Sequence, residues 1–272
     1  MASLFLYKKK DETSIFDLIY FKNGKLDLEK VKDLLDKNKA EYDDKKVFNK
    51  EGYTQTIIDS EKGLLSSTYI FRNILGQYTT IEFDEKSEGL KVIRSPYIYF
   101  GQSRLLIKDN VNILVKANYS NEEKVKGECI SFFQEVGIEI EPVKFDNNLF
   151  QHIKNNYTWK KIKIQKIERE KDSTKNISYE VDPSSDKESE VDKIYSECGV
   201  YDSIAFTIPY EQSLYNVKMY KVGRKITVEE SQFATKELFE EFCLYLMNEI
   251  MAIINNVSEL GENDININEG EE

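Results

Sequence analysis

Residues 68–100 read TYIFRNILGQYTTIEFDEKSEGLKVIRSPYIYF, and this stretch decides the predicted fold. Its β-branched and aromatic side chains recur in short runs, such as residues 68–74 and 78–83, which is the composition of strands. Glycines lie between the runs, as they do at turns or bulges. The same pattern extends over residues 53–117, where we predict an antiparallel sheet of short strands.

Helices are predicted on either side of further strands. The segment Ser120-Asn121-Glu122-Glu123 matches a capping box, and apolar side chains at helical spacing follow it. In a second helix, the apolar positions cover more than half of the circumference. We therefore predict an α+β fold, in which an antiparallel β-rich N-terminal portion precedes a mixed sheet covered by helices at about 120–136 and 235–254. Other predicted elements are strands at 15–21, 138–141, 157–167, 201–208 and 214–222, and helices at 25–39 and 146–154.

The length of 272 residues suits one large domain or two small ones. We predict a β-rich portion with one helix over 1–117 and an α+β portion over 118–256. Within the second portion, residues 169–192 are polar and charged, which predicts a flexible loop. Residues 257–272 are predicted to be an acidic, disordered tail.

Several catalytic classes are excluded by residue counts. The single histidine, His152, cannot supply a zinc site of the H-E-x-x-H type. Cys129, Cys198 and Cys243 form no C-x-x-C pair, and scattered thiols suit a reducing compartment. Neither a Gly-rich dinucleotide fingerprint nor a phosphate-binding P-loop is present. We predict no catalytic residue, no metal site and no cofactor.

The chain is predicted to be cytoplasmic and to have no contact with a membrane. Its N-terminal run Leu4-Phe5-Leu6-Tyr7 is short and is followed by lysines, whereas a signal peptide carries its charge first. No stretch reaches the roughly 18 apolar residues of a membrane span. Abundant Asn, Ile, Lys and Tyr indicate an AT-rich genome, such as that of a low-GC bacterium or a phage, and phage defence or counter-defence is a plausible setting.

Two segments are predicted to form a protein interface. Arg94 and Arg104 bracket Tyr97 and Tyr99, and exposed arginine and tyrosine are typical of interfaces. This segment is alternatively a hairpin with core aromatics, or a phosphate site. The broad apolar face of the C-terminal helix suits a partner or a second subunit, although a core helix packed on a sheet fits it equally. Its predicted contact residues are Phe242, Leu246 and Ile250.

A basic, aromatic sheet face is the alternative site. Lysines could contact phosphates there while an aromatic ring stacks on a base, provided that two strand regions are neighbours. Simple alternation would instead point the lysines into water and the rings into the core. The net charge of −11 also disfavours nucleic acid. The residues concerned are Tyr157, Trp159, Lys161, Lys163, Lys218, Tyr220, Lys221, Arg224 and Lys225.

A metal-dependent nuclease is the third hypothesis. It needs paired carboxylates and a lysine, often with E-x-K spacing. Glu141-Pro142-Val143-Lys144 has one residue too many, and Glu85-Lys86 has one too few. The carboxylates considered are Glu82, Asp84, Glu85, Glu88, Glu139 and Glu141.

The leading hypothesis is a non-catalytic cytosolic binding or regulatory protein that acts through protein–protein contacts. It would bind a partner protein, form a homo-oligomer, or do both. Its basis is the absence of nucleophile, metal and phosphate-loop motifs.

Overall fold

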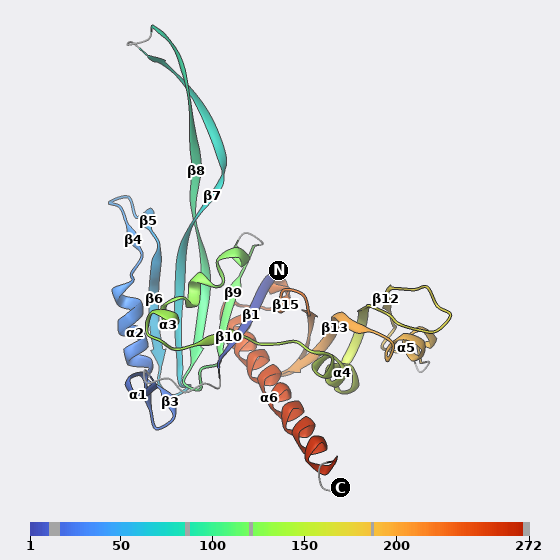
Figure 1. The fold of residues 1–272 in the computed structure, drawn as a ribbon. Coiled ribbons are helices and arrows are strands. Elements are labelled where there is room, and N and C mark those ends of the chain that lie inside the picture. Colours follow the sequence, from blue (N-terminus) through green and yellow to red (C-terminus); the bar gives the residue numbers. More distant parts are fainter. Residues whose placement is uncertain (11–16, 85–87, 120–121, 186–187, 269–272) are drawn as a thin grey trace. The chain divides into compact units, whose positions relative to one another are not determined.

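A computed structural model describes residues 1–10, 17–84, 88–119, 122–185 and 188–268. It shows the predicted α+β class, with antiparallel pairing between neighbouring sheet strands. The chain divides into two compact units, which Figure 1 allows the reader to follow by colour. Unit 1 comprises Met1–Asp11, Asn112–Tyr119 and Glu139–Glu272, and unit 2 comprises Glu12–Val111 and Ser120–Ile138.

Unit 1 is built on an antiparallel sheet. Its strands lie in the order β12 (Asn176–Glu180), β11 (Thr158–Gln165), β13 (Val200–Tyr210), β14 (Ser213–Tyr220), β15 (Lys225–Val228), β1 (Ala2–Lys9) and β9 (Ile113–Ala117), and β10 (Ile140–Pro142) also pairs with β1. Residues 2–7 of β1 are all buried, as expected of a nearly continuous apolar run in the interior of a sheet.

The N-terminal strand belongs to the sheet formed by the C-terminal half. Leu4 lies opposite Ile226 of β15, and Phe5 lies opposite Val115 of β9. The two units therefore differ from the predicted division at residues 117 and 118. A strand that is apolar on both faces needs a paired strand at each edge and a packed layer on each face. The position of the strand in the sequence does not reveal which elements provide these neighbours.

Two helices, α4 (Asn147–Asn156) and α6 (Lys236–Asn268), contribute buried side chains to unit 1. The Asp146 carboxylate accepts a hydrogen bond from the Leu149 backbone N–H at 2.9 Å and caps α4. The Thr235 hydroxyl caps α6 in the same way. The structure confirms a helix over 235–254, but α6 runs on to Asn268, so the predicted acidic tail begins inside this helix.

Residues 169–192 include regular elements and are not one flexible loop as predicted. β12 pairs along β11, with Ile177 opposite Ile164. Helix α5 (Glu190–Tyr195) begins after Ser189, whose hydroxyl accepts a hydrogen bond from the Asp192 backbone N–H. A polar composition predicted a loop, but the polar side chains of this segment form hydrogen bonds with one another and with the backbone. These hydrogen bonds hold the segment in regular structure.

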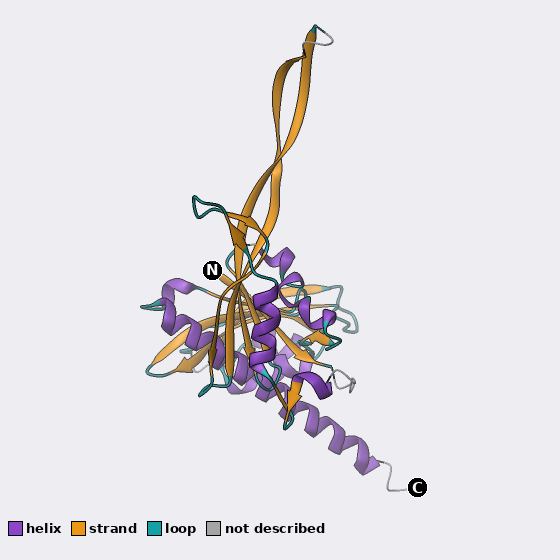
Figure 2. Ribbon diagram, turned by 90° about the vertical axis from the view of Figure 1, so that its left-hand side faces the viewer, coloured by secondary structure: helices purple, strands orange, loops and turns teal. Residues whose placement is uncertain are grey.

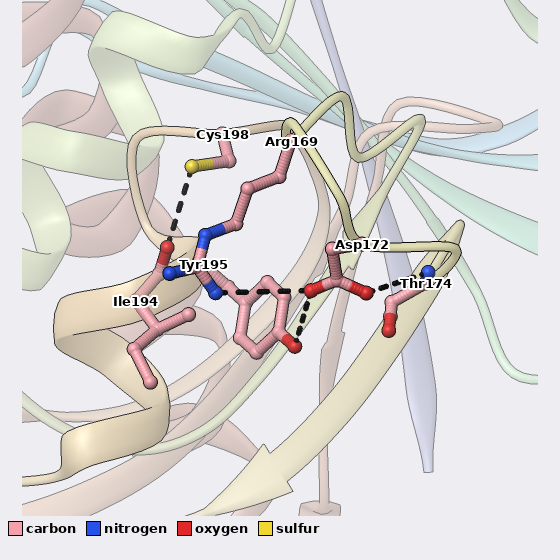
Figure 3. Close-up of polar contacts among 6 residues, drawn as sticks. All are labelled: Arg169, Asp172, Thr174, Ile194, Tyr195 and Cys198. Carbon is pink, nitrogen blue, oxygen red and sulfur yellow. Dashed lines mark hydrogen bonds and ion pairs between the residues drawn. The ribbon is translucent and has the colours of Figure 1, made fainter.

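Asp172 shows how this segment is held (Figure 3). Its carboxylate accepts hydrogen bonds from the Thr174 backbone N–H and from the Tyr195 hydroxyl, both at 2.8 Å. The Arg169 guanidinium lies 3.8 Å from the same carboxylate. Asp172 therefore joins a tight turn to the end of α5.

These contacts make Asp172 unusually acidic. The Thr174 hydrogen bonds, then the Tyr195 hydroxyl and Arg169, lower its pKa from 3.8 to about 2. The ionised carboxylate therefore stabilises the fold fully above pH 3.8, and this contribution is lost as the pH falls through about 2. An NMR titration of the Asp172 carboxyl carbon should give a midpoint near pH 2, with Asp172→Asn identifying the signal. A midpoint at 3.8 would show that the contacts do not form.

Unit 2 combines a three-stranded sheet with small elements. The elements of its first segment, in chain order, are α1 (Asp17–Tyr20), β2 (Phe21–Lys22), β3 (Lys25–Leu26), α2 (Leu28–Lys37), β4 (Glu41–Tyr42), β5 (Phe48–Lys50), β6 (Gly52–Asp59), β7 (Leu64–Asp84) and β8 (Gly89–Lys108). β7 lies between β6 and β8. Helix α2, predicted at 25–39, buries Val31 and Leu35. The strand predicted at 15–21 is wrong over residues 17–20, which form α1.

The helix predicted at 120–136 is wrong in its described part. Residues 120 and 121, with the N-cap of the proposed capping box, lie outside the described residues. Three short pieces follow, η1 (Glu122–Val125), η2 (Glu128–Ile130) and α3 (Phe132–Glu135). Gly127 and Ser131, both weak helix formers, lie at the breaks. The apolar spacing reflects burial of Cys129, Phe132 and Phe133, not a continuous helix.

Two long strands replace most of the short strands predicted over 53–117. Gly76 lies at a bulge within β7, between Ile74 and Gln77, and does not end a strand. Gly101 lies inside β8 opposite Phe71, and a Cβ atom on Gly101 would be 2.3 Å from the Phe71 ring. Gly76 thus permits a bulge, and Gly101 permits a close ring contact, within long strands. Composition alone does not distinguish such glycines from glycines at turns.

Candidate protein-interaction surface on the β7–β8 ribbon

The far part of β7 and β8 forms a two-stranded ribbon. β6 accompanies β7 only as far as the pair Gly52–Ile70. Beyond it, the pairing of β7 with β8 continues to Asp84 and Gly89. We call residues 72–84 and 89–100 the ribbon, and Figures 1 and 2 show its two strands extending beyond β6 of the same unit.

One face of the ribbon is largely apolar. Cross-strand partners point to the same face, and successive levels on that face are two residues apart. We call the residues on this face the apolar row. From the β6 end to the tip its pairs are Ile74–Ile98, Gln77–Pro96, Thr79–Arg94, Ile81–Val92 and Phe83–Leu90.

A bulge at Leu75 and Gly76 changes which residue of β7 lies on this face. Strict alternation back from Gln77 would place Leu75 on the apolar row and Ile74 on the opposite face. The additional residue in β7 instead aligns Ile74 with Ile98. The bulge therefore determines that Ile74, and not Leu75, occupies the fifth level of the apolar row.

The opposite face is more polar. Its pairs include Glu82–Lys91 and Tyr78–Ser95. The charged pair lies between the two most apolar levels of the row. The ribbon is therefore amphipathic, with alternation on both strands.

The apolar row is exposed. The exposed fractions are 64% for Ile81, 65% for Phe83 and 75% for Leu90. A contiguous set of large apolar side chains in water is unfavourable, and such sets mark interaction sites in folded proteins. A hairpin of two strands is also only marginally stable in water unless a third strand or a packed layer covers it. The ribbon therefore has the properties of a surface that another chain covers.

The predicted interface residues of β8 divide between the ribbon and its base. Arg94 lies in the middle of the apolar row, and Tyr97 is exposed in the ribbon. Tyr99 lies opposite Asn73 at the start of the ribbon. Arg104 lies in the three-stranded part, where its guanidinium donates to the Thr68 hydroxyl at 3.3 Å.

The strongest apolar residues of the ribbon were missed from the sequence. Ile81, Phe83, Leu90 and Val92 were read as ordinary strand residues of a sheet with a covered face. Alternation with the charged residues of the opposite face was a visible signal. The sequence could not show that no further strand or helix of the described chain covers this face.

The predicted interface on α6 is corrected. Phe242, Leu246 and Ile250 are at most 1% exposed. The Phe242 ring lies 4.9 Å from that of Tyr215 in β14, between ring centres. These side chains form the core between α6 and the sheet of unit 1, and no partner could reach them without unfolding it.

The alternative basic surface is not one continuous aromatic face. β13 lies between β11 and β14, so the two predicted strand regions are not adjacent, although Lys161 and Lys218 both lie opposite Ala205 of β13. Trp159 lies opposite Phe206, on the face that α4 and α6 cover, and the Tyr157 hydroxyl donates to Glu249 of α6 at 3.3 Å. A bulge at Lys160 shifts the register, and Lys161 lies opposite Ala205 on the other face. Trp159 thus faces away from Lys161 and Lys163.

The cations of this surface already have partners within the chain. Lys161 pairs with Glu180, whose pKa it lowers, and Lys163 pairs with Asp202 at 2.9 Å. The remaining predicted residues make internal contacts. Lys218 and Lys225 lie over the Tyr220 ring at 4.5 and 5.4 Å, Lys221 donates to Asn147 at 3.1 Å, and Arg224 donates to the Pro142 carbonyl at 3.3 Å.

The carboxylates considered for a nuclease are not gathered at one site. Glu82 lies opposite Lys91 in the ribbon. Glu139 and Glu141 pair with Lys10 at 2.6 Å and Lys8 at 3.7 Å. Asp84 and Glu88 lie near the ribbon tip, and Glu85 lies outside the described residues. Among the described residues, no group of three or more potential metal ligands is found.

A cavity of about 520 Å³ lies in unit 1 beside Trp159. Its wall includes an ion pair between Lys154 and Asp192 at 2.7 Å. The Tyr179 hydroxyl donates to the same Asp192 carboxylate at 2.6 Å, and burial raises the pKa of Tyr179. These polar groups bond to one another, so they do not indicate which ligand the cavity would bind.

The sequence matches no model of a known protein family and no curated protein. Over the described part of the chain, no helix is long and apolar enough to cross a membrane.

Proposed function

We propose that this chain is a non-catalytic binding protein that acts through protein–protein contacts, with the apolar row of the ribbon as its contact surface. The exposure of Ile81, Phe83 and Leu90 on one face of a two-stranded ribbon carries this proposal. Covering them would remove apolar surface from water and add a layer to a marginal hairpin. Both effects favour association.

The test uses affinity capture from the native host with the full chain as bait. In one variant, Ile81→Thr and Val92→Thr replace a cross-strand apolar pair with a β-branched residue that still suits a strand. Burial of two such side chains contributes about 3 kcal/mol, so we expect roughly hundredfold weaker binding of captured protein. Quantitative mass spectrometry of the eluates measures this change.

The matched control carries Glu82→Thr and Lys91→Thr. These substitutions lie on the same strands, one residue away, on the opposite face, and they leave the net charge unchanged. We expect native levels of capture from this control and similar thermal unfolding of all three proteins. Equal capture by the native chain and the Ile81/Val92 variant would show that the proposal is wrong.

A further inference from the structure

We infer that the apolar row binds a second copy of this chain, with the two ribbons stacked face to face and their tips pointing the same way. This inference rests on the proposed function, because it names the partner of the same surface. The observation that carries it is that both strands contribute an apolar residue at three of the five levels of the row.

Stacking in this orientation pairs chemically similar groups. A twofold axis parallel to the strands places β7 of one copy over β8 of the other, so each residue faces the equivalent of its own cross-strand partner. Ile81 then faces Val92 of the second copy, and Phe83 faces Leu90. The three apolar levels thus meet apolar levels, and Gln77 faces Pro96 of the second copy.

Arg94 selects this orientation over the opposite one. Thr79–Arg94 is the middle one of the five levels. With the ribbons stacked tip to base, full overlap would place Arg94 over Arg94 of the second copy, and like charges in an interface are unfavourable. In the tip-to-tip orientation, Arg94 faces Thr79, whose hydroxyl can accept a hydrogen bond from the guanidinium.

The size of the apolar row sets the expected affinity of the dimer. Four intervals of two residues at about 3.4 Å per residue give a face roughly 27 Å long and two strands wide. This is smaller than the standard size of specific interfaces and corresponds to a weak or transient contact. We therefore expect a concentration-dependent dimer with a dissociation constant on the order of micromolar.

Sedimentation velocity of the purified full chain tests this inference. Between about 1 and 100 μM, we expect the native chain to shift from monomer to dimer. Ile81→Lys alone and Val92→Glu alone should each weaken the dimer by at least about tenfold, because each buries an unpaired charge. The Glu82/Lys91 control should behave as the native chain does.

Mixing the two single variants tests the orientation. In a mixed dimer stacked tip to tip, the lysine introduced at position 81 of one chain faces the glutamate introduced at position 92 of the other. The native Val92 and Ile81 face each other at the equivalent place. We expect the mixture to recover dimerisation to within a few-fold of the native chain. Tip-to-base stacking would place position 81 opposite Gln77, and the mixture would show no recovery.

Failure here is distinguishable from failure of the proposed function. A native chain that remains monomeric, or a dimer unaffected by Ile81→Lys, would overturn the inference of a second copy. If affinity capture still depended on Ile81 and Val92, the ribbon would remain a protein-binding surface with another partner. If it did not, both proposals would be wrong.

Discussion

Replacing Phe242 with alanine is expected to lower the free energy of unfolding by about 3–5 kcal/mol, because it leaves a cavity where a large ring was buried. The Phe242 ring is fully buried. Its ring centre lies 5.0 Å from that of Phe233 and 5.6 Å from that of Tyr210. Urea unfolding followed by circular dichroism measures the change.

Asn248→Ala is the matched control for this prediction. Asn248 is exposed on the same helix, so its replacement should change stability by no more than about 0.5 kcal/mol. A Phe242→Ala chain as stable as the control would contradict the packing of α6 against the sheet. The predicted interface on this helix would then need to be considered again.

Replacing Gly52 with alanine is expected to destabilise unit 2 by at least about 3 kcal/mol, from backbone strain and overpacking together. Gly52 has φ +145°, a conformation that side chains disfavour. A Cβ atom there would be 2.3 Å from the Asn38 carbonyl oxygen and 2.5 Å from the Ala40 nitrogen. These are backbone atoms, so no side-chain rotation relieves the clash.

Gly76→Ala separates strain from clash. Gly76 has nearly the same φ, +138°, but a Cβ atom added there would have no neighbouring atom within 4 Å. We expect this substitution to cost only about 1–3 kcal/mol, the backbone strain alone. Thermal unfolding of both variants measures the difference, and equal losses would show that the contact between β6 and the end of α2 is not as close as described.

The α6 helix shows what periodicity could and could not predict. Its position followed from the spacing of Phe242, Leu246 and Ile250, because helical spacing is a local property of the sequence. Whether this face packs on its own sheet or on a partner depends on tertiary contacts with Tyr210 and Tyr215. The sequence was consistent with both arrangements, and the structure places these residues in the core.

The sheet partners of β1 could not be predicted for a related reason. Its apolar run indicated a buried strand, but the pairing of Leu4 with Ile226 joins residues more than two hundred positions apart. Nothing in the local pattern encodes such a distant partner. The same limit applies to Trp159 and Lys161, which a bulge at Lys160 places on opposite faces.

The segment 94–99 of the ribbon was predicted as a protein interface, but the apolar residues of the row were predicted only as strand residues. The alternation of Ile81 and Phe83 with Glu82 is typical of a sheet with one covered face. Only the exposure of these side chains shows that the described chain leaves the apolar row uncovered. The candidate site therefore depends on which layers pack over the ribbon, and local sequence does not encode this.

Hydrogen–deuterium exchange of the ribbon tests the contact surface most directly. In dilute monomer, amides of residues 72–84 and 89–100 should exchange quickly, because a two-stranded hairpin opens easily. At concentrations that favour association, or with a captured partner bound, we expect slower exchange in these residues and little change in the core of unit 1. Protection that develops elsewhere while the ribbon exchanges as before would contradict the apolar row as the contact surface.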